Sequence, residues 1–165
     1  MINKYELPEF DEIINLEKKS NKDGSGLTFK ELNGYWKLKY VWKKGSEEKD
    51  NILSSLLQVL CASLELSNLK TKDNKDIFEI QNSIKFGFFS IVFTGKAFLK
   101  GSRPLLMFYF ERFSLKIGKY NLIKNNLEKI DNKKMPFFSL IAVARNEKWM
   151  CARGKGGGLA IWTKY

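Results

Sequence analysis

After Gly34, large apolar side chains alternate with lysines, and this pattern constrains the fold more than any other feature of the chain. The apolar side chains take one side of the pattern: Trp36, Leu38, Tyr40 and Trp42. The lysines take the other: Lys37, Lys39 and Lys43. A period of two residues is typical of a strand with one buried face and one solvated face. A slip of one residue would expose three large aromatic rings, so the register is strongly specified.

Short apolar runs separated by turn residues continue to the end of the chain. The runs are Ile77–Ser83, Phe86–Thr94, Lys96–Lys100, Leu105–Ile117, Tyr120–Ile123, Phe137–Ala144, Trp149–Arg153 and Leu159–Thr163. Many short strands with no long helix between them indicate an antiparallel meander rather than a parallel sheet. Eight or nine strands favour a closed barrel, which removes exposed sheet edges.

Two segments have helical spacing. Pro8, followed by Phe10, Ile13 and Ile14, indicates an amphipathic helix near residues 8–19. Residues 51–63 begin with helical spacing and run into a stretch that suits a strand, so they predict a second short helix without fixing its end. We therefore expect a single domain over residues 1–165. An N-terminal helix and loop would occupy residues 1–30, and a mostly β, antiparallel barrel of 8–9 strands would occupy residues 31–165.

The chain has no histidine. This excludes Ser-His-Asp and Cys-His catalysis and zinc sites that use histidine. Cys61 and Cys151 are too few for a disulfide scaffold or a four-thiolate metal site, and they are either buried apolar groups, a pair or one reactive thiol. The acidic pairs have polar surroundings that would not raise a carboxyl pKa. We therefore expect no enzymatic activity, no catalytic residue, no metal and no cofactor.

Positive charge is concentrated toward the C-terminus. Lys and Arg number 29 against 18 Asp and Glu, and residues 101–165 supply +9 of the net +11. Such a distribution predicts a face that attracts an anionic membrane surface, an acidic protein or nucleic acid. The basic residues expected on that face are Lys116, Lys119, Lys124, Lys133, Lys134 and Lys155.

Two runs, Phe86–Phe93 and Leu105–Phe110, are apolar at almost every position, so a barrel wall built from them needs a cover on its outer side. The N-terminal helix is the simplest cover, and a partner or a membrane surface is the alternative. Glu111 and Arg112 then interrupt the apolar pattern. A glutamate that points into a barrel needs a partner, for which Arg103 and Arg145 are the candidates.

Residues 153–158 contain the glycines of a phosphate loop but not the Walker A spacing, and no helix follows them. A hairpin turn explains these glycines, although Lys155 and nearby backbone N–H groups could still hold an anion. The N-terminus lacks the apolar segment of a secretory signal, and the apolar runs are shorter than the roughly 18 residues of a membrane span. We therefore expect a soluble, cytoplasmic protein that is not secreted.

Gly34-Tyr35-Trp36 resembles the opening of the first long strand in calycin, or lipocalin-like, barrels. In that architecture the tryptophan closes one end of the barrel, and a late arginine lies across the indole in a cation–π contact. The resemblance implies that Gly34, Trp36 and Arg153 close this barrel.

Three segments in order resemble the plastid lipid-associated protein (PAP/fibrillin) family of cyanobacteria and plastids. They are Leu32-Asn33-Gly34-Tyr35-Trp36-Lys37-Leu38, then Gly101-Ser102-Arg103-Pro104 before Phe108-Tyr109-Phe110-Glu111-Arg112 and Leu115, then Arg153-Gly154 with Gly158-Leu159. The resemblance covers residues 30–165. It implies a lipocalin-like barrel that holds carotenoids, quinones or lipids at a photosynthetic membrane, with the protein peripheral to the thylakoid.

The leading hypothesis is non-enzymatic binding or carriage of an apolar small molecule at an anionic membrane. The residues expected to line the cavity and its mouth are Trp36, Tyr40, Trp42, Phe89, Ile91, Phe93, Phe108, Phe110, Glu111 and Arg112. Two alternatives stay open. One is a basic barrel that binds nucleic acid, against which the inward alternation of the aromatic residues argues. The other is a bilin-handling protein similar to chromophore lyases, in which Cys151 or Glu111 would matter.

Overall fold

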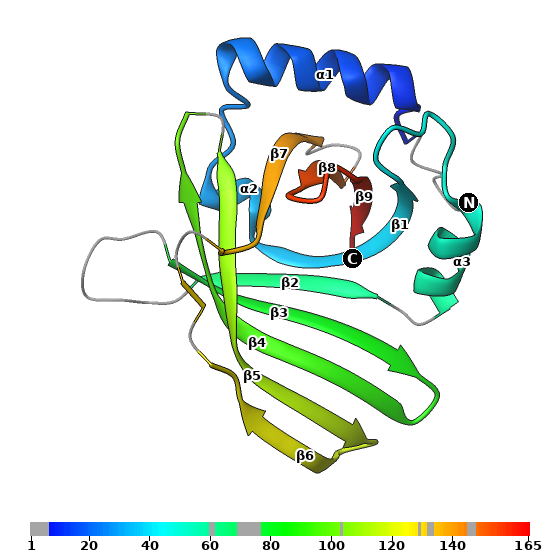
Figure 1. The fold of residues 1–165 in the computed structure, drawn as a ribbon, viewed down its shortest axis with the longest axis vertical. Helices are drawn as coiled ribbons and strands as arrows, with labels where there is room; N and C mark the ends of the chain where they lie inside the picture. Colours follow the sequence, from blue (N-terminus) through cyan, green and yellow to red (C-terminus); the bar gives the residue numbers. More distant parts are fainter. Residues whose placement is uncertain are drawn as a thin grey trace.

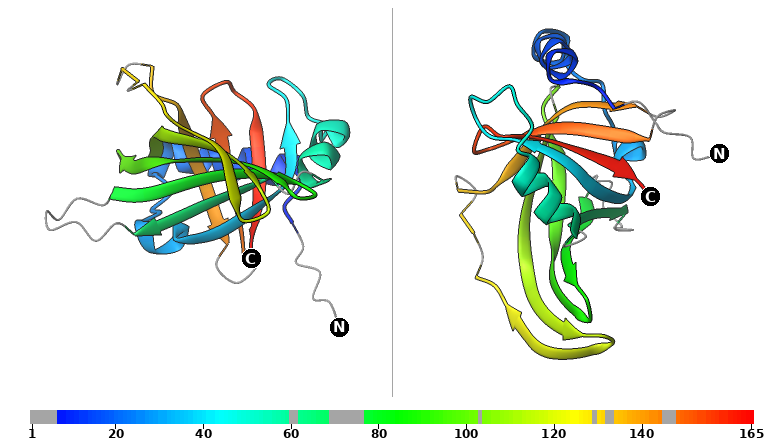
Figure 2. Two further views of the ribbon diagram at one scale, coloured as in Figure 1. Left: turned by 90° about the horizontal axis from the view of Figure 1, so that it is seen from below. Right: turned by 90° about the vertical axis from the view of Figure 1, so that its right-hand side faces the viewer.

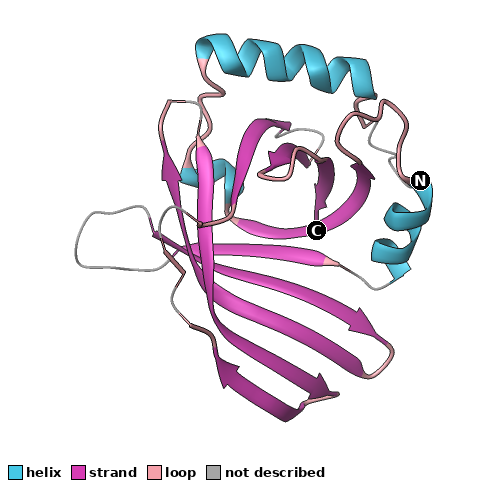
Figure 3. Cartoon of the chain, viewed as in Figure 1, coloured by secondary structure: helices cyan, strands magenta, loops and turns pink. Residues whose placement is uncertain are grey.

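The computed structural model describes residues 7–59, 62–68, 77–102, 104–128, 130–131, 134–144 and 148–165. Nine strands within these residues form one antiparallel sheet in the order β4-β3-β2-β1-β9-β8-β7-β5-β6. The pairing of β4 with β5 closes the sheet into a ring (Figure 1; Figure 3). The predicted antiparallel, lipocalin-like barrel with an N-terminal helix is confirmed.

The strands are β1 (Gly34–Trp42), β2 (Ser63–Asn68), β3 (Ile77–Phe86), β4 (Phe89–Lys100), β5 (Leu105–Ile117), β6 (Tyr120–Asn126), β7 (Phe137–Ala144), β8 (Trp149–Gly154) and β9 (Leu159–Lys164). The helices are α1 (Phe10–Asp23), α2 (Phe29–Leu32) and α3 (Asn51–Val59). The predicted N-terminal helix and second short helix correspond to α1 and α3.

The barrel continues into a curved extension, because β5 changes its partner along its length. Residues 105–107 of β5 pair with β7 and complete the ring, whereas residues 112–117 pair with β6. The distal halves of β3, β4 and β5 therefore project beyond the ring together with β6 (Figure 1; Figure 2). We call this projection the arm and define it as residues 82–94 and 112–126.

Side chains fill the closed part of the barrel. The most deeply buried of them are Leu32, Trp36, Leu66, Phe78, Ile80, Ala97, Leu106, Leu140, Met150 and Ala152. The indole Nε1–H of Trp36 donates to the carbonyl oxygen of Leu32 at 2.8 Å, so α2 lies across that end of the core. Within the described residues, the closed part of the barrel thus holds one contiguous cluster of buried side chains.

A β-bulge divides β1 and sends its aromatic residues to opposite sides of the wall. The register with β9 shifts between Leu38 and Tyr40. Trp36 and Leu38 consequently belong to the barrel core, whereas Tyr40 and Trp42 pack on the outer side near α1. The prediction that all four side chains share one face is wrong, because a bulge adds a residue and inverts the alternation.

The outer cover provided by α1 lies on β7, β8 and β9. Ile13 of α1 is fully buried in a second apolar cluster, whose strand residues are Trp42, Ile141, Trp149, Cys151, Leu159 and Ile161. The prediction that the helix covers the runs 86–93 and 105–110 is wrong. Strands β7 to β9 carry large apolar residues on both faces, and they provide the cluster on which the helix packs.

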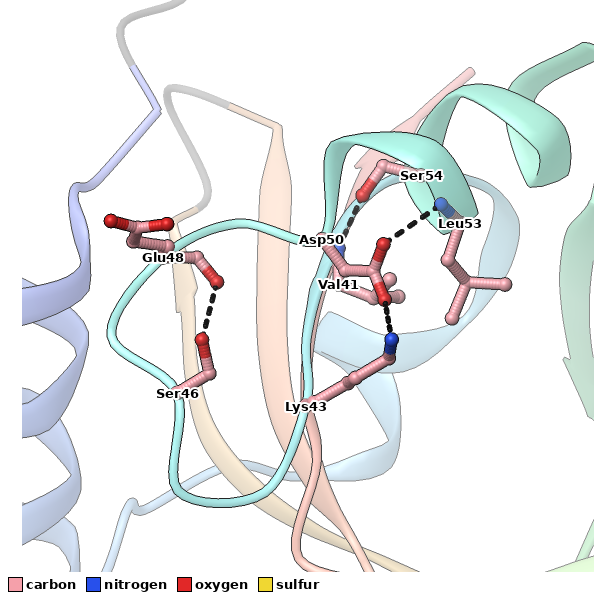
Figure 4. Close-up of polar contacts among 7 residues, drawn as sticks. All are labelled: Val41, Lys43, Ser46, Glu48, Asp50, Leu53 and Ser54. Carbon is pink, nitrogen blue, oxygen red and sulfur yellow. Dashed lines mark hydrogen bonds and ion pairs between the residues drawn. The ribbon is translucent and has the colours of Figure 1, made fainter.

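Polar contacts fix the start of α3 beside the end of β1 (Figure 4). Asp50 Oδ1 accepts the N–H of Leu53 at 2.9 Å, and Ser54 Oγ accepts the N–H of Val41 at 3.0 Å. Lys43 Nζ lies 2.9 Å from Asp50 Oδ2. The Leu53 hydrogen bond, with a smaller contribution from Lys43, holds the pKa of Asp50 below its ordinary value. Asp50 is therefore the N-cap of this helix.

The sequence pattern predicted a break between two strands at Gly95. In the structure Gly95 lies inside the single strand β4. The register with β5 shifts beside it, between Thr94 and Gly95. A Cβ atom at this position would meet the carbonyl oxygen of Tyr109 and would lie 2.7 Å from the Cα of Phe110. The two backbones approach here at a distance that only glycine allows.

The substitution Gly95→Ala is expected to lower the free energy of unfolding by about 1–3 kcal/mol, because β4 and β5 must move apart. Gly156→Ala is the matched control, since an added Cβ there has nothing within 4 Å. Its effect should stay within about 0.5 kcal/mol. Urea denaturation of both variants measures the difference, and equal losses would contradict the close approach at Gly95.

Candidate functional site

The arm has one apolar face, which continues the barrel core. Paired residues on neighbouring strands share a face. Phe93 pairs with Phe113, Ile91 with Leu115, and Phe89 with Ile117, and Ile84 and Phe86 of β3 complete these rows. We call this set, with Phe110 at its base, the apolar face. The opposite face of the arm carries the buried pair Val92 and Ser83 together with Lys85, Ser90, Thr94, Arg112, Ser114 and Lys116.

A continuous row of aromatic rings connects the barrel core to the apolar face. Phe138 lies 5.5 Å from Trp162 and 5.1 Å from Phe108 between ring centroids. The row then passes from Phe108 to Phe110 at 5.5 Å, to Phe93 at 5.4 Å and to Phe113 at 5.2 Å. These spacings suit aromatic pairs in van der Waals contact. The same packed surface is thus buried at one end and solvated at the other.

Solvent reaches the distal part of the arm, because α1 packs on other strands. Phe89 is 51% exposed and Phe86 is 64% exposed. Tyr120, Leu122 and Ile123 of β6 are exposed as well. Large contiguous apolar surfaces of this kind mark interaction sites in proteins.

The predicted ligand-binding residues do not form one cavity. Phe89, Ile91, Phe93 and Phe110 lie on the apolar face. Trp36 and Phe108 are buried in the barrel core, and Tyr40 and Trp42 lie on the outer side with α1. The prediction that one ligand cavity is lined by all of these residues is therefore wrong for Trp36, Phe108, Tyr40 and Trp42.

Sequence reasoning missed Phe113, Leu115 and Ile117, although a signal was present. Residues 105–110 are large at every position, whereas beyond Arg112 the large apolar residues of β5 occupy odd positions only. The core-facing residues before this point are the even ones, Leu106 and Phe108. The parity changes at Glu111, where the strand register with β4 also shifts. A change of parity inside a long apolar strand is typical of a bulge.

Glu111 and Arg112 lie at this bulge and line a cavity of about 510 Å³ with Lys96, Tyr109, Phe110, Asn126 and Leu127. Lys96 Nζ is 3.5 Å from Glu111 Oε1, and both side chains are part-exposed. The suggested partners Arg103 and Arg145 lie outside the described residues. Glu111 therefore forms its ion pair with Lys96 of the neighbouring strand β4. Solvent-exposed ion pairs of this kind contribute little to the free energy of unfolding.

Arg153 anchors α1 and does not lie across the indole of Trp36. Its Nε and Nη2 donate to the two carboxylate oxygens of Glu17 at 2.7 and 2.6 Å, and its Nη1 donates to the carbonyl oxygen of Gly157 at 2.6 Å. The hydrogen bonds that Arg153 donates to Glu17 raise the pKa of the Arg153 guanidinium. Odd residues of β8 face α1 and even residues face the core, so Arg153 points away from Trp36.

Lys164 takes the position over the indole that was predicted for Arg153. Its Nζ lies 5.1 Å from the centroid of the Trp36 ring. A Cβ at Gly34 would lie 2.6 Å from Cε of Lys164, so the glycine leaves room for this lysine. A cation from the C-terminal part of the chain does lie over the Trp36 indole beside Gly34, as predicted. The cation is Lys164 and not Arg153.

The predicted anionic-surface lysines divide between two regions. Lys116, Lys119 and Lys124 belong to the arm, whereas Lys134 and Lys155 lie near β7 and in the β8–β9 turn. Lys133 lies outside the described residues. The turn itself is confirmed as a hairpin, because the N–H groups of residues 154, 155 and 157 donate to carbonyl oxygens.

No model of a known protein family matches the sequence, and no curated protein matches it. The resemblance to the plastid lipid-associated family therefore stays a prediction. Within the described residues, no helix is long and apolar enough to cross a bilayer. In the same part of the chain, no three Asp, Glu or Cys side chains converge to hold a metal ion.

The substitution Glu17→Ala is expected to lower the free energy of unfolding by about 2 kcal/mol, because it removes two charge-assisted hydrogen bonds at a mostly buried carboxylate and leaves Arg153 without them. Glu111→Gln, which breaks the part-exposed pair with Lys96, should cost less than about 0.5 kcal/mol. Thermal denaturation of the two variants tests this ranking, and the reverse order would rule out the anchoring role of Glu17.

The Cys151 thiol is expected to be unreactive in the folded protein. Burial raises its pKa to about 12, so the nucleophilic thiolate is scarce at pH 8. In a Cys61→Ser background, Ellman's reagent should detect no thiol before unfolding and one thiol in denaturant. Rapid labelling of the folded variant would show that Cys151 is accessible and would restore it as a candidate attachment site for a bilin.

Proposed function

We propose that the protein binds an apolar small molecule, of the carotenoid, quinone or lipid class, on the apolar face of the arm and catalyses no reaction on it. The observation that supports this proposal is the aromatic row that leaves the barrel core, continues through the part-buried Phe93 and Phe113, and reaches exposed apolar surface at Phe89. A ligand laid on this surface would continue the packing of the core.

The shape of the apolar face suits a long ligand. From Phe110 to Ile117 the β5 strand spans about 23 Å at the usual rise per residue. Three neighbouring strands contribute side chains along this length, so a chain-like molecule could contact all of them. Covering each exposed Phe, Ile or Leu stabilises the complex by up to about 1.5–3 kcal/mol.

Nucleic acid fits this arrangement less well. Bases would stack on the aromatic rings of the apolar face, whereas the backbone phosphates need cations close by. Lys85, Arg112 and Lys116 lie on the opposite face of the arm. A single strand could not use both sets of side chains at the same place.

The substitution Ile91→Asp is expected to weaken binding of the neutral fluorescent probe N-phenyl-1-naphthylamine at least tenfold, because it places a charge at the centre of the apolar face. Ile52→Asp is the matched control, since Ile52 is an exposed isoleucine of α3, outside the arm. Equilibrium titration measures the dissociation constants, with circular dichroism as a check of folding.

Phe89→Ser provides a second variant at a more exposed position, in case Ile91→Asp folds poorly. The proposal also expects apolar material to be extracted from protein purified from its native host. Saturable probe binding that neither arm variant weakens, or a wild-type protein that binds no probe and carries no extractable ligand, would contradict it.

A further inference from the structure

We infer that the tip of the arm inserts into the surface of an anionic lipid bilayer. The tip is formed by the β3–β4 turn and the β5–β6 turn, with their flanking residues 85–89 and 116–120. The inference extends the proposed function by naming the surface on which the arm docks. It is tested on protein without its apolar ligand, so the two proposals can fail separately.

The two turns form one structural unit. The backbone N–H of Gly118 donates to the carbonyl oxygen of Phe88 at 2.7 Å, which joins the hairpins at their ends. Gly87 and Gly118 both have positive φ angles, of 56° and 54°, which suit tight two-residue hairpin turns. The two turns therefore end one projection of the sheet beyond the barrel (Figure 2).

The aromatic side chains at the tip are largely solvated. Phe88 is 82% exposed and Tyr120 is 67% exposed, and the exposed Phe86 lies beside the turn. A phenylalanine at the apex of a turn does not contribute to the folded core when it is exposed to this degree. Phenylalanine inserts at the boundary of the acyl chains, and tyrosine lies at the level of the headgroups.

Charge identifies the kind of surface. The arm carries five cationic residues, of which Lys85, Lys116 and Lys119 lie at the tip, while Arg112 and Lys124 lie farther back. It carries no Asp or Glu. Lys119 Nζ lies 5.5 Å from the centroid of the Tyr120 ring, so a cation accompanies the exposed rings at the tip. Each lysine near an anionic leaflet strengthens binding about fivefold.

A second copy of the chain fits this surface less well than a membrane does. Two arms packed tip to tip would bring together six cations, three from each tip, without a counter-charge from either arm. An anionic leaflet supplies the counter-charge and the apolar layer at once. The apolar face runs down to the tip, so a ligand could pass between the bilayer and the arm without crossing water.

Flotation with vesicles gives the first test. Wild-type protein should bind vesicles of phosphatidylcholine and phosphatidylglycerol in a 3:1 ratio much more tightly than vesicles of phosphatidylcholine alone. Phe88→Ser should weaken binding to the anionic vesicles roughly tenfold or more. Lys119→Glu should weaken it at least about fivefold, and added salt should weaken it further.

Matched controls separate the tip from general effects of charge and exposed aromatic area. Tyr165→Ser removes an aromatic ring with 86% exposure at the end of β9, and Lys18→Glu makes the same charge change on α1. Both should bind anionic vesicles within about twofold of wild type. Losses equal to those of the tip variants would overturn the assignment of the tip.

Tryptophan quenching by brominated lipid gives the second test. The four native tryptophans, Trp36, Trp42, Trp149 and Trp162, are all buried, so the Phe88→Trp variant adds one accessible indole. Its added emission should shift to the blue and be quenched by brominated lipid in anionic vesicles, whereas that of Tyr165→Trp should not.

Three outcomes would overturn the inference. The first is wild-type protein that ignores anionic vesicles. The second is a concentration-dependent dimer that Phe88→Ser abolishes, which would assign the tip to a second copy. The third is tight, salt-dependent binding of single-stranded nucleic acid that the tip variants weaken while vesicle binding is absent.

Discussion

The pairing of β4 with β5 along their whole length is the constraint on which the rest of the structure depends. The near half of this pair closes the barrel, and the far half supports the arm. Gly95 allows the two backbones to approach where the register shifts, and Glu111 is the extra residue on the other strand. One pair of strands thus belongs to a packed core and to an open surface, and the aromatic row follows it from one to the other.

Much of the fold could be predicted from the sequence because alternation is a local property. The antiparallel class, the closed barrel and the N-terminal helix follow from periodicity and turn residues. The place of β6 did not, because a simple meander would pair it with β7, whereas β5 pairs with both. The β-bulges could not be predicted in this way. Each bulge inverts the alternation, so the side chains beyond it point to the other face of the sheet. For that reason Tyr40 was assigned to the wrong side of β1, and Gly95 was taken as a break between strands when it lies inside β4.

The candidate site was only partly predictable for a related reason. Phe89, Ile91 and Phe93 could be identified as one face of a strand from their spacing. Whether that face was covered depended on where α1 packs, which is a tertiary property. The role of Arg153 depended on its odd position in β8, which aims it at Glu17, while Lys164 of the next strand reaches the indole. Long flexible cations near a sheet end are difficult to assign without the neighbouring strand.

The two apolar clusters also divide the molecule mechanically. Strands β7 to β9 are packed on both faces, by the barrel interior and by α1, whereas the distal part of the arm is exposed at Phe86, Phe88 and Phe89. Fewer packing contacts therefore stabilise the free end of the sheet than its closed end. Local opening of the sheet is therefore expected to begin at the projecting hairpins rather than at the strands that are packed on both faces.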